Sequence, residues 1–475
     1  MATQVIVELE DLDHFASTSY AAPSPKPPVL LTDAAASPST IRPSQDHAPY
    51  KRRAWMVITQ LAGINFITSF SGGLLTVGLP TMAADLALQE SLLVWPTSVY
   101  ALTSGTCLLL GGSLADVIGP RPVNLTGGFF LSCFILASGF SRTGIELIMF
   151  RAMQGVASAL VVPSSFSIVS TSIEQGKPRN IGFACLGLAM PLGYSLGLVL
   201  GGVFISSIGW RAGYYVGGAV SFLFWLAGIF ALPAVAVAHP EEAPMTRRLA
   251  TEIDWIGAAL ASACLATFSY VLAYNAFGRC CEHPTTDQYL PLIFQNVQTT
   301  SPLGASLRLL PSFIVGTVVN LTTGIIVDRV PATYAVLISS GLCAGAPLLM
   351  AVISPRWPYW YDAFFAQVLA PLSADVLFTV GLLVVSDVFP TRTQALAGAV
   401  FNTASQLGVS IGLTIISIIS TSVTAKSDRT EQASPDAIMA GYRAGFWAMF
   451  AWMVLACVVG GFGLRKIGKV GMKRD

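Results

Sequence analysis

Long apolar segments recur along this chain, and they constrain its fold more than any other feature. A helix that crosses the hydrocarbon core of a bilayer needs about 20 mostly apolar residues. Six segments of this kind lie on each side of a polar stretch at 237–252. They run near 55–79, 93–114, 123–141, 147–173, 181–207, 213–236, 254–277, 304–327, 333–353, 362–386, 394–421 and 444–464. The 394–421 segment is rich in Ser and Thr, which suggests that part of it is loop. We therefore predict an all-α polytopic membrane protein with about 12 transmembrane helices.

Charged side chains are scarce, with 26 Lys and Arg and 25 Asp and Glu among 475 residues. At 11% they fall far below the roughly 25% of a soluble domain. The net charge of +1 offers no basic stripe for a nucleic acid. An even number of segments places both termini on the same side of the membrane. Lys and Arg near the segment ends are nearly twice as frequent on that side as on the opposite side. The positive-inside rule then places both termini in the cytoplasm.

Polar stretches divide the chain into five predicted parts. Residues 1–50, rich in Pro, Ser and Ala, form a disordered cytoplasmic tail, since they cannot bury enough surface to fold. No apolar core follows a basic start there, so we expect no cleaved signal peptide. The other parts are an N-terminal six-helix bundle at 51–236, a cytoplasmic linker at 237–252, a C-terminal six-helix bundle at 253–465, and a basic cytoplasmic tail at 466–475.

One cluster of possible metal ligands runs from Cys280 to His283. Its spacing matches no standard zinc site, and we expect no bound metal. No Gly-x4-Gly-Lys-Ser/Thr loop is present, which argues against a pump driven by ATP. We therefore expect no cofactor and no catalytic residue, and a proton gradient as the energy source.

A short motif follows the second segment, Gly112-Ser-Leu-Ala-Asp116-Val-Ile-Gly119-Pro-Arg121. Gly112 and Gly119 permit tight turning and close helix approach. Asp116 can accept hydrogen bonds from the start of an adjacent helix. The motif resembles the loop motif of the major facilitator superfamily, Gly-x-Leu-x-Asp-Arg-x-Gly-Arg-Arg/Lys, with Val117 at its first basic position. The second half carries a fainter copy, Gly-Ile-Ile-Val-Asp328-Arg329, as a duplicated half predicts.

The fourth segment begins with Arg151-Ala-Met-Gln154-Gly155 and resembles the fourth-helix motif of the same superfamily, Arg-x-x-Gln-Gly. A buried Arg is costly, so Arg151 should face the bundle interior and be paired. Gln154 lies three residues on and shares that helix face. The resemblance implies a role for both residues in proton coupling. The alternative is a structural Arg that reaches the outer interface.

The fifth segment carries Gly193-Tyr-Ser-Leu-Gly197-Leu-Val-Leu-Gly201-Gly202. Glycines at this spacing form a smooth helix face against which another helix can press or slide. The stretch is similar to the antiporter motif of the superfamily, Gly-x3-Gly-Pro-x2-Gly-Gly, although a Leu replaces the Pro. The alternative is a packing seam without a role in coupling.

Taken together, these motifs resemble the drug:proton antiporter branch of the major facilitator superfamily, of the fungal multidrug and toxin efflux type. That resemblance implies two six-helix bundles around a cytoplasmic link. Many members of this branch have fourteen spans. An abrupt junction at 277–289 suggests that two spans are missing here.

Asp375 lies midway along the 362–386 segment. An acid at the bilayer midplane is a functional hypothesis by default. Proton uptake there could bias the protein between inward-open and outward-open states. The alternative is a neutral, hydrogen-bonded structural acid. Polar residues inside segments are the candidates for a central cavity, because an amide facing lipid is costly. The candidates are Asn65, Tyr194, Gln367, Asn402 and Gln406, drawn from a wider set of such residues that also includes Gln60, Tyr100 and Asn320.

The resulting expectation is a monomeric carrier, in the plasma membrane, that expels small amphipathic organic compounds in exchange for protons. Its partners would be the substrate, protons and the lipid bilayer, and no nucleic acid. Two alternatives remain open. One is a facilitator or symporter that imports a nutrient, and the other is a truncated paralogue that transports nothing.

Overall fold

The computed structural model describes residues 47–89, 92, 95–233, 245–278, 302–353, 357, 359–390, 393–427, 435–465, 468 and 470. Most of the predicted tail at 1–50 lies outside these residues, as do the Cys280–His283 cluster and most of the junction at 277–289. Most of the predicted linker before residue 245 and of the basic tail at 466–475 also lies outside them.

The regular structure of the described residues is helical, and no strand occurs among those residues. The first run consists of α2 (His47–Asp85), α3 (Trp95–Ile118), α4 (Pro120–Gly139), α5 (Gly144–Ser172), α6 (Lys177–Ser207) and α7 (Trp210–Ala231). The second consists of α8 (Met245–Thr251), α9 (Trp255–Gly278), α11 (Pro302–Ile326), α12 (Ala332–Val352), η4 (Tyr359–Tyr361), α13 (Ala363–Leu369), α14 (Pro371–Val388), α15 (Gln394–Ser427) and α16 (Pro435–Gly463).

Ten helical segments in the described residues are long and apolar enough to cross a membrane. The helices α9 and α11, with 24 and 25 residues, occupy the two remaining predicted segments. Large apolar side chains point outward, and Phe230, Ile256 and Phe462 are 82%, 75% and 70% exposed. Outward-facing apolar side chains on long apolar helices are typical of a protein surrounded by lipid. The polytopic all-α prediction is confirmed.

Three details differ from the predicted segments. The 394–421 segment contains no loop, because α15 runs through it without a break. The 362–386 segment instead consists of α13 and α14, with Pro371 in the first turn of α14. Proline lacks an N–H and fits a helix start better than a helix interior. The helix α2 begins at His47, so residues 47–50 of the predicted tail form its first residues.

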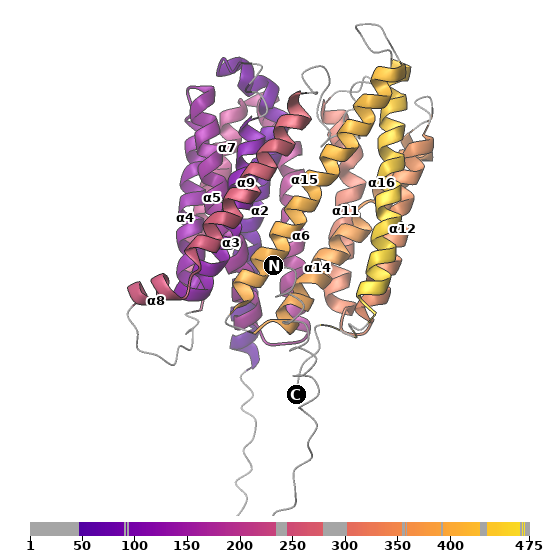
Figure 1. The fold of residues 1–475 in the computed structure, drawn as a ribbon. Coiled ribbons are helices and arrows are strands. Elements are labelled where there is room, and N and C mark those ends of the chain that lie inside the picture. The colour runs from indigo at the N-terminus through magenta and orange to yellow at the C-terminus, as the bar shows by residue number, and fades with distance from the viewer. Residues whose placement is uncertain are drawn as a thin grey trace, which may run out of the picture. The chain divides into compact units, whose positions relative to one another are not determined.

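Contacts between helices occur within each run and also across the two runs. The helices α3 and α4 both pack on α5, and α12 and α15 both pack on α16. Across the runs, α6 packs against α11 and α14, and α3 packs against α15. In Figure 1 these long helices lie side by side. The division into bundles at 51–236 and 253–465 stays a prediction.

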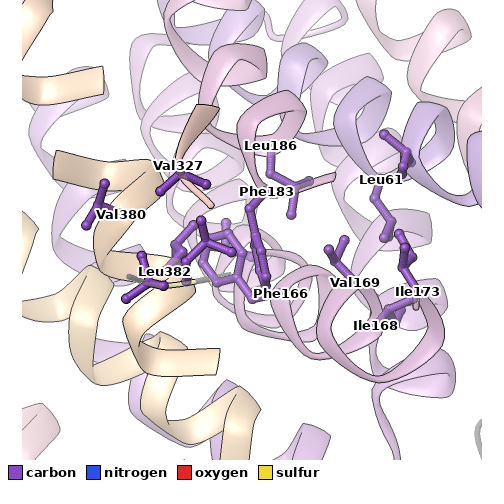
Figure 2. Close-up of a cluster of buried hydrophobic side chains, with 14 of the residues drawn as sticks. Leu61, Phe166, Ile168, Val169, Ile173, Phe183, Leu186, Val327, Val380 and Leu382 are labelled. Atoms are coloured by element: carbon purple, nitrogen blue, oxygen red, sulfur yellow. The ribbon is translucent and has the colours of Figure 1, made fainter. Parts of the chain in front are cut away.

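A cluster of buried apolar side chains joins helices of both runs (Figure 2). Phe166 of α5 and Phe183 of α6 belong to it together with Leu382 of α14. Aromatic contacts extend the cluster, because the ring of Phe378 in α14 lies 6.2 Å from that of Phe166 and 5.8 Å from that of Phe401 in α15. Four helices are thus held together where α5 ends and α6 begins.

Candidate functional site

Asp116 joins the end of α3 to the start of α15. Its Oδ1 accepts a hydrogen bond from the backbone N–H of Ala395 (3.0 Å), and its Oδ2 accepts one from that of Leu396 (2.9 Å). The first N–H groups of a helix have no partner within it, and they favour a negative charge. Asp116 therefore caps a helix that lies some 280 residues further along the chain. This agrees with the prediction that Asp116 accepts hydrogen bonds from the start of an adjacent helix.

The other residues of this loop motif serve the same close packing. A Cβ on Gly112 would lie 2.7 Å from the side chain of Ala399, so α3 can approach α15 only with glycine there. Gly119 turns the chain from α3 into α4 at φ +108°, a region that other residues rarely adopt. Arg121 donates to the carbonyl of Ile229 at the end of α7 (2.9 Å). It forms no ion pair with the motif aspartate in the described part of the chain.

The copy of the motif in the second half does not form an equivalent cap. Asp328 follows α11, and its buried Oδ1 has no hydrogen-bond partner among the described residues. The backbone N–H of Arg329 donates to the carbonyl of Ile326 (2.8 Å), which only closes the turn. The sequence similarity between the two halves therefore does not extend to the contact that Asp116 makes.

An ion pair between α6 and α14 was not predicted from the sequence. Nη2 of Arg179, near the start of α6, lies 2.5 Å from Oδ1 of Asp387, near the end of α14. The Arg179 side chain is only 1% exposed. Close by, Ser170 of α5 donates a hydrogen bond to Gln394, the first residue of α15. The sequence placed both charges at segment ends, but it did not show that they meet.

Arg151 is the centre of a buried polar network in the first six helices. Its Nη1 donates to the Ser71 hydroxyl of α2 (3.1 Å) and to Oε1 of Gln154 (3.0 Å), and its Nε donates to the carbonyl of Pro96 (3.3 Å). Its guanidinium carbon lies 4.8 Å from the centre of the Tyr100 ring. The side chain is 2% exposed, so it faces the protein interior and is paired there, as expected.

Gln154 extends this network to α4. Its Nε2 donates to the hydroxyl of Ser138 (2.7 Å) and to the carbonyl of Phe134 (3.0 Å). It is 1% exposed, and it shares a helix face with the arginine, as the spacing of three residues predicted. The role of Arg151 and Gln154 in proton coupling stays a prediction.

The glycines of the fifth segment form a contact between α6 and α2. A Cβ on Gly193 or on Gly197 would collide with a backbone carbonyl of α2. A Cβ on Gly201 would lie 3.3 Å from the side chain of Leu74, also in α2, whereas Gly202 has nothing within 4 Å. Three of the four glycines therefore allow two backbones to touch, and Gly202 lies off this seam.

Asp375 of α14 lies against α11. A Cβ on Gly316 would come within 2.7 Å of its Oδ2, so a larger residue there would displace this carboxylate. One turn further along both helices, the hydroxyl of Thr379 donates to Oδ1 of Asn320 (3.0 Å), and Asn320 is fully buried. A Cβ on Gly187 of α6 would lie 3.0 Å from the same oxygen. The acid thus belongs to a polar row between α11 and α14, whose second rung, at Asn320, faces α6.

The sequence indicated Asn320 as a polar group within a segment, but it predicted neither Thr379 nor the pairing of the two residues. The sequence signal for this site was the amide of Asn320 within an otherwise apolar helix. Such a group needs a hydrogen-bond partner away from lipid.

The five cavity candidates lie on four helices, α2, α6, α13 and α15. Asn65 is buried and donates to a serine of α5 (3.2 Å), and the hydroxyl of Tyr194 lies 3.1 Å from that of a threonine in α2. Gln367 and Asn402 are buried, whereas Gln406 is exposed. No hydrogen bond joins any two of them in the part of the chain that the structure describes. Their role as cavity lining stays a prediction.

The structure contains a small pocket elsewhere, between α5, α6, α14 and α15. Phe166, Phe183 and Leu382 give it apolar walls, and Ser386 and Gln394 supply polar groups. It lies beside the Asp116 cap and the Arg179 ion pair, so it belongs to the contact between the two runs of helices.

Comparison with known proteins agrees with the loop, fourth-helix and fifth-helix motifs. Residues 61–413 match the Major Facilitator Superfamily. MFS-type transporter 1 of Pyricularia oryzae is 34% identical, over 89% of this chain and 85% of that protein. Efflux pump terJ of Aspergillus terreus is 23% identical, over 72% of this chain and 76% of the pump.

The alignment with the Pyricularia protein runs over 523 positions but covers only 89% of 475 residues. That relative therefore has segments without a counterpart here. Among solved structures, the human organic anion transporter MFSD10 (TETRAN) superposes with a TM-score of 0.61 at 16% identity, over 87% of this chain and 99% of that one. The chain belongs to the Major Facilitator Superfamily.

Proposed function

We propose that this membrane protein exports amphipathic organic compounds in exchange for protons, by alternating access between two helical bundles. The observation that carries the proposal is the position of Asp375. Its carboxylate lies in a row of polar groups between α11 and α14, and the next rung of that row, at Asn320 and Thr379, faces α6. The efflux pump among the relatives supports the direction of transport.

A proton on Asp375 changes the charge at a helix contact that must rearrange during transport. A charged carboxylate within the bilayer is costly, and protonation removes that cost. The protein would therefore favour one arrangement of α6, α11 and α14 with the proton bound and another without it. The glycine contact between α6 and α2 would let α6 slide during this change. Arg151 cannot release a proton, so it would act on coupling through its charge, held in place by Gln154.

The Asp116 cap and the Arg179–Asp387 pair would hold one side of the carrier closed. Both link helices of the first run to helices of the second. By the positive-inside rule this side faces the cytoplasm. The remaining parts of the proposal are a plasma-membrane location, cytoplasmic termini, a monomeric state and no cofactor besides the proton gradient.

The test is transport by Asp375→Asn in liposomes that contain purified protein. Dansylated amphiphiles serve as substrates. Two rates are measured: substrate transport driven by an imposed pH gradient, and exchange of substrate across the membrane without a gradient. We expect the variant to lose gradient-driven movement and to keep exchange, because only the first needs a proton site. Asp362→Asn removes the carboxylate directly before α13, where the observed span begins at Ala363, and should keep both activities.

Unchanged gradient-driven transport by Asp375→Asn would contradict the assignment of the proton site. The direction of transport has its own test in a deletion strain. Increased sensitivity to toxic compounds supports export, whereas reduced uptake of a nutrient would support import. Failure of the wild-type protein to move any solute would favour the truncated, non-transporting alternative.

A further inference from the structure

Arg151 carries a buried positive charge that no carboxylate neutralises within the described part of the chain. Three ion pairs occur there, and none of them includes this arginine. Its partners are a carbonyl, a serine hydroxyl, an amide oxygen and the face of a tyrosine ring. All four are neutral, and the side chain is only 2% exposed.

Such an arrangement is incomplete in electrostatic terms. Removing a charge from water costs several kcal/mol, and neutral hydrogen-bond partners offset only part of this cost. An arginine cannot escape the cost by losing its proton. Its hydrogen bonds use Nε and Nη1, while Nη2 has no hydrogen bond to a described residue. Half of a fork suited to a carboxylate therefore remains available.

The position of Ser71 links this charge to the helix contact that would move during transport. Ser71 is the hydroxyl partner of Arg151 on α2, and the next residue, Gly72, lies against the ring of Tyr194 on α6 (3.7 Å for a Cβ built there). On the same stretch of α2, the rings of Phe66 and Phe70 stack at 6.3 Å. A charged group and a pair of stacked aromatic rings thus lie on the stretch of α2 that contacts α6.

We propose that Arg151 is a specificity-determining residue that binds the anionic group of the transported molecule. The substrates would then be amphipathic organic anions, with a carboxylate at Arg151 and an apolar body against the aromatic rings of α2 and α6. The bound anion supplies the missing counter-charge, and a neutral or cationic analogue leaves the arginine uncompensated. This inference rests on the proposed function, and it specifies the substrate class of that transporter.

The test compares three probes that share one apolar body. Dansylglycine carries a carboxylate, dansylglycinamide is neutral, and dansylcadaverine is cationic. Binding to purified protein is followed by dansyl fluorescence, and transport driven by a pH gradient is measured separately in liposomes. We expect wild-type protein to bind dansylglycine at least about tenfold more tightly than the amide, as suits a charge-assisted bond.

Two variants should remove this preference by different routes. Arg151→Gln deletes the positive charge, whereas Ser71→Asp supplies a counter-ion within the protein and keeps the arginine. Because Ser71→Asp should leave the buried charge better compensated, it keeps the test decisive if Arg151→Gln does not fold. Ser206→Asp adds the same charge at the exposed end of α6 and should keep the preference.

Equal binding of the three probes by wild-type protein would overturn the assignment of Arg151. So would a preference for dansylglycine that survives Ser71→Asp. Loss of the preference in Ser71→Asp but not in Ser206→Asp supports it. A wild-type protein that selectively binds dansylglycine but moves no probe under a pH gradient would leave the anion site standing and refute the proposed transport function.

Discussion

Asp116 offers the sharpest test of how the two runs of helices are held together. Its two carboxylate oxygens each accept one backbone N–H at the start of α15. Asp116→Asn keeps the size of the side chain but removes the charge and replaces one acceptor by an N–H donor. One hydrogen bond is therefore lost, and two donors are brought face to face.

The expected magnitude follows from these two contacts. A hydrogen bond to a charged group contributes about 1.5–3 kcal/mol, and its loss leaves a buried N–H without a partner. A shift of that size changes the ratio of open to closed protein by roughly 10- to 150-fold. The effect should be on the opening of this side, since the contact joins α3 to α15 and not to a neighbour in its own run.

Ser386 provides a reporter for this opening. It lines the pocket beside the cap and is 7% exposed, so a cysteine placed there should react slowly while this side is closed. In a cysteine-free background carrying Ser386→Cys, the rate of alkylation by an impermeant maleimide should rise at least about tenfold in Asp116→Asn.

The matched control is Asp328→Asn, which changes the equivalent aspartate of the second half. Its buried Oδ1 has no hydrogen-bond partner among the described residues, so alkylation at Ser386→Cys should change little. An equal rise in both variants, or no rise in Asp116→Asn, would refute the reasoning that the cap holds this side closed.

Three further predictions concern packing and stability. Gly197→Val should abolish transport and lower the melting temperature, because the new side chain meets a carbonyl of α2, whereas Gly202→Ala, with nothing within 4 Å, should be tolerated. Asp387→Ala should lower the free energy of unfolding by about 3 kcal/mol, because it leaves Arg179 buried without its counter-ion. Adding Arg179→Met should restore most of this loss. Burial raises the pKa of Asp362 above its ordinary value of 3.8. Its charged form therefore destabilises the fold above that raised pKa, and the destabilisation disappears as the pH falls toward the ordinary value. Asp362→Asn should accordingly raise the melting temperature at neutral pH, and the gain should vanish in acid.

Much of the fold could be predicted from the sequence because membrane helices satisfy their hydrogen bonds locally. The length of each apolar segment already indicates a crossing, and the segments correspond to the helices observed. The face shared by Arg151 and Gln154 also followed from helix geometry alone. The break at Pro371 was missed because apolar content is uniform across it, so hydropathy gives no boundary there.

The partners of each polar group depended on which helices meet. Asp116 bonds to residues some 280 positions away, and Arg179 finds its counter-ion at Asp387 in another helix. Nothing local in the sequence specifies such pairs, because the lateral packing of helices sets them. By itself, the sequence determined that the chain forms membrane-spanning helices with few charges inside. Only the tertiary structure decided which charges meet a partner of opposite sign and which, like that of Arg151, meet none among the described residues. The physical reason is that neutralisation depends on distances between helices and not on spacing along one helix.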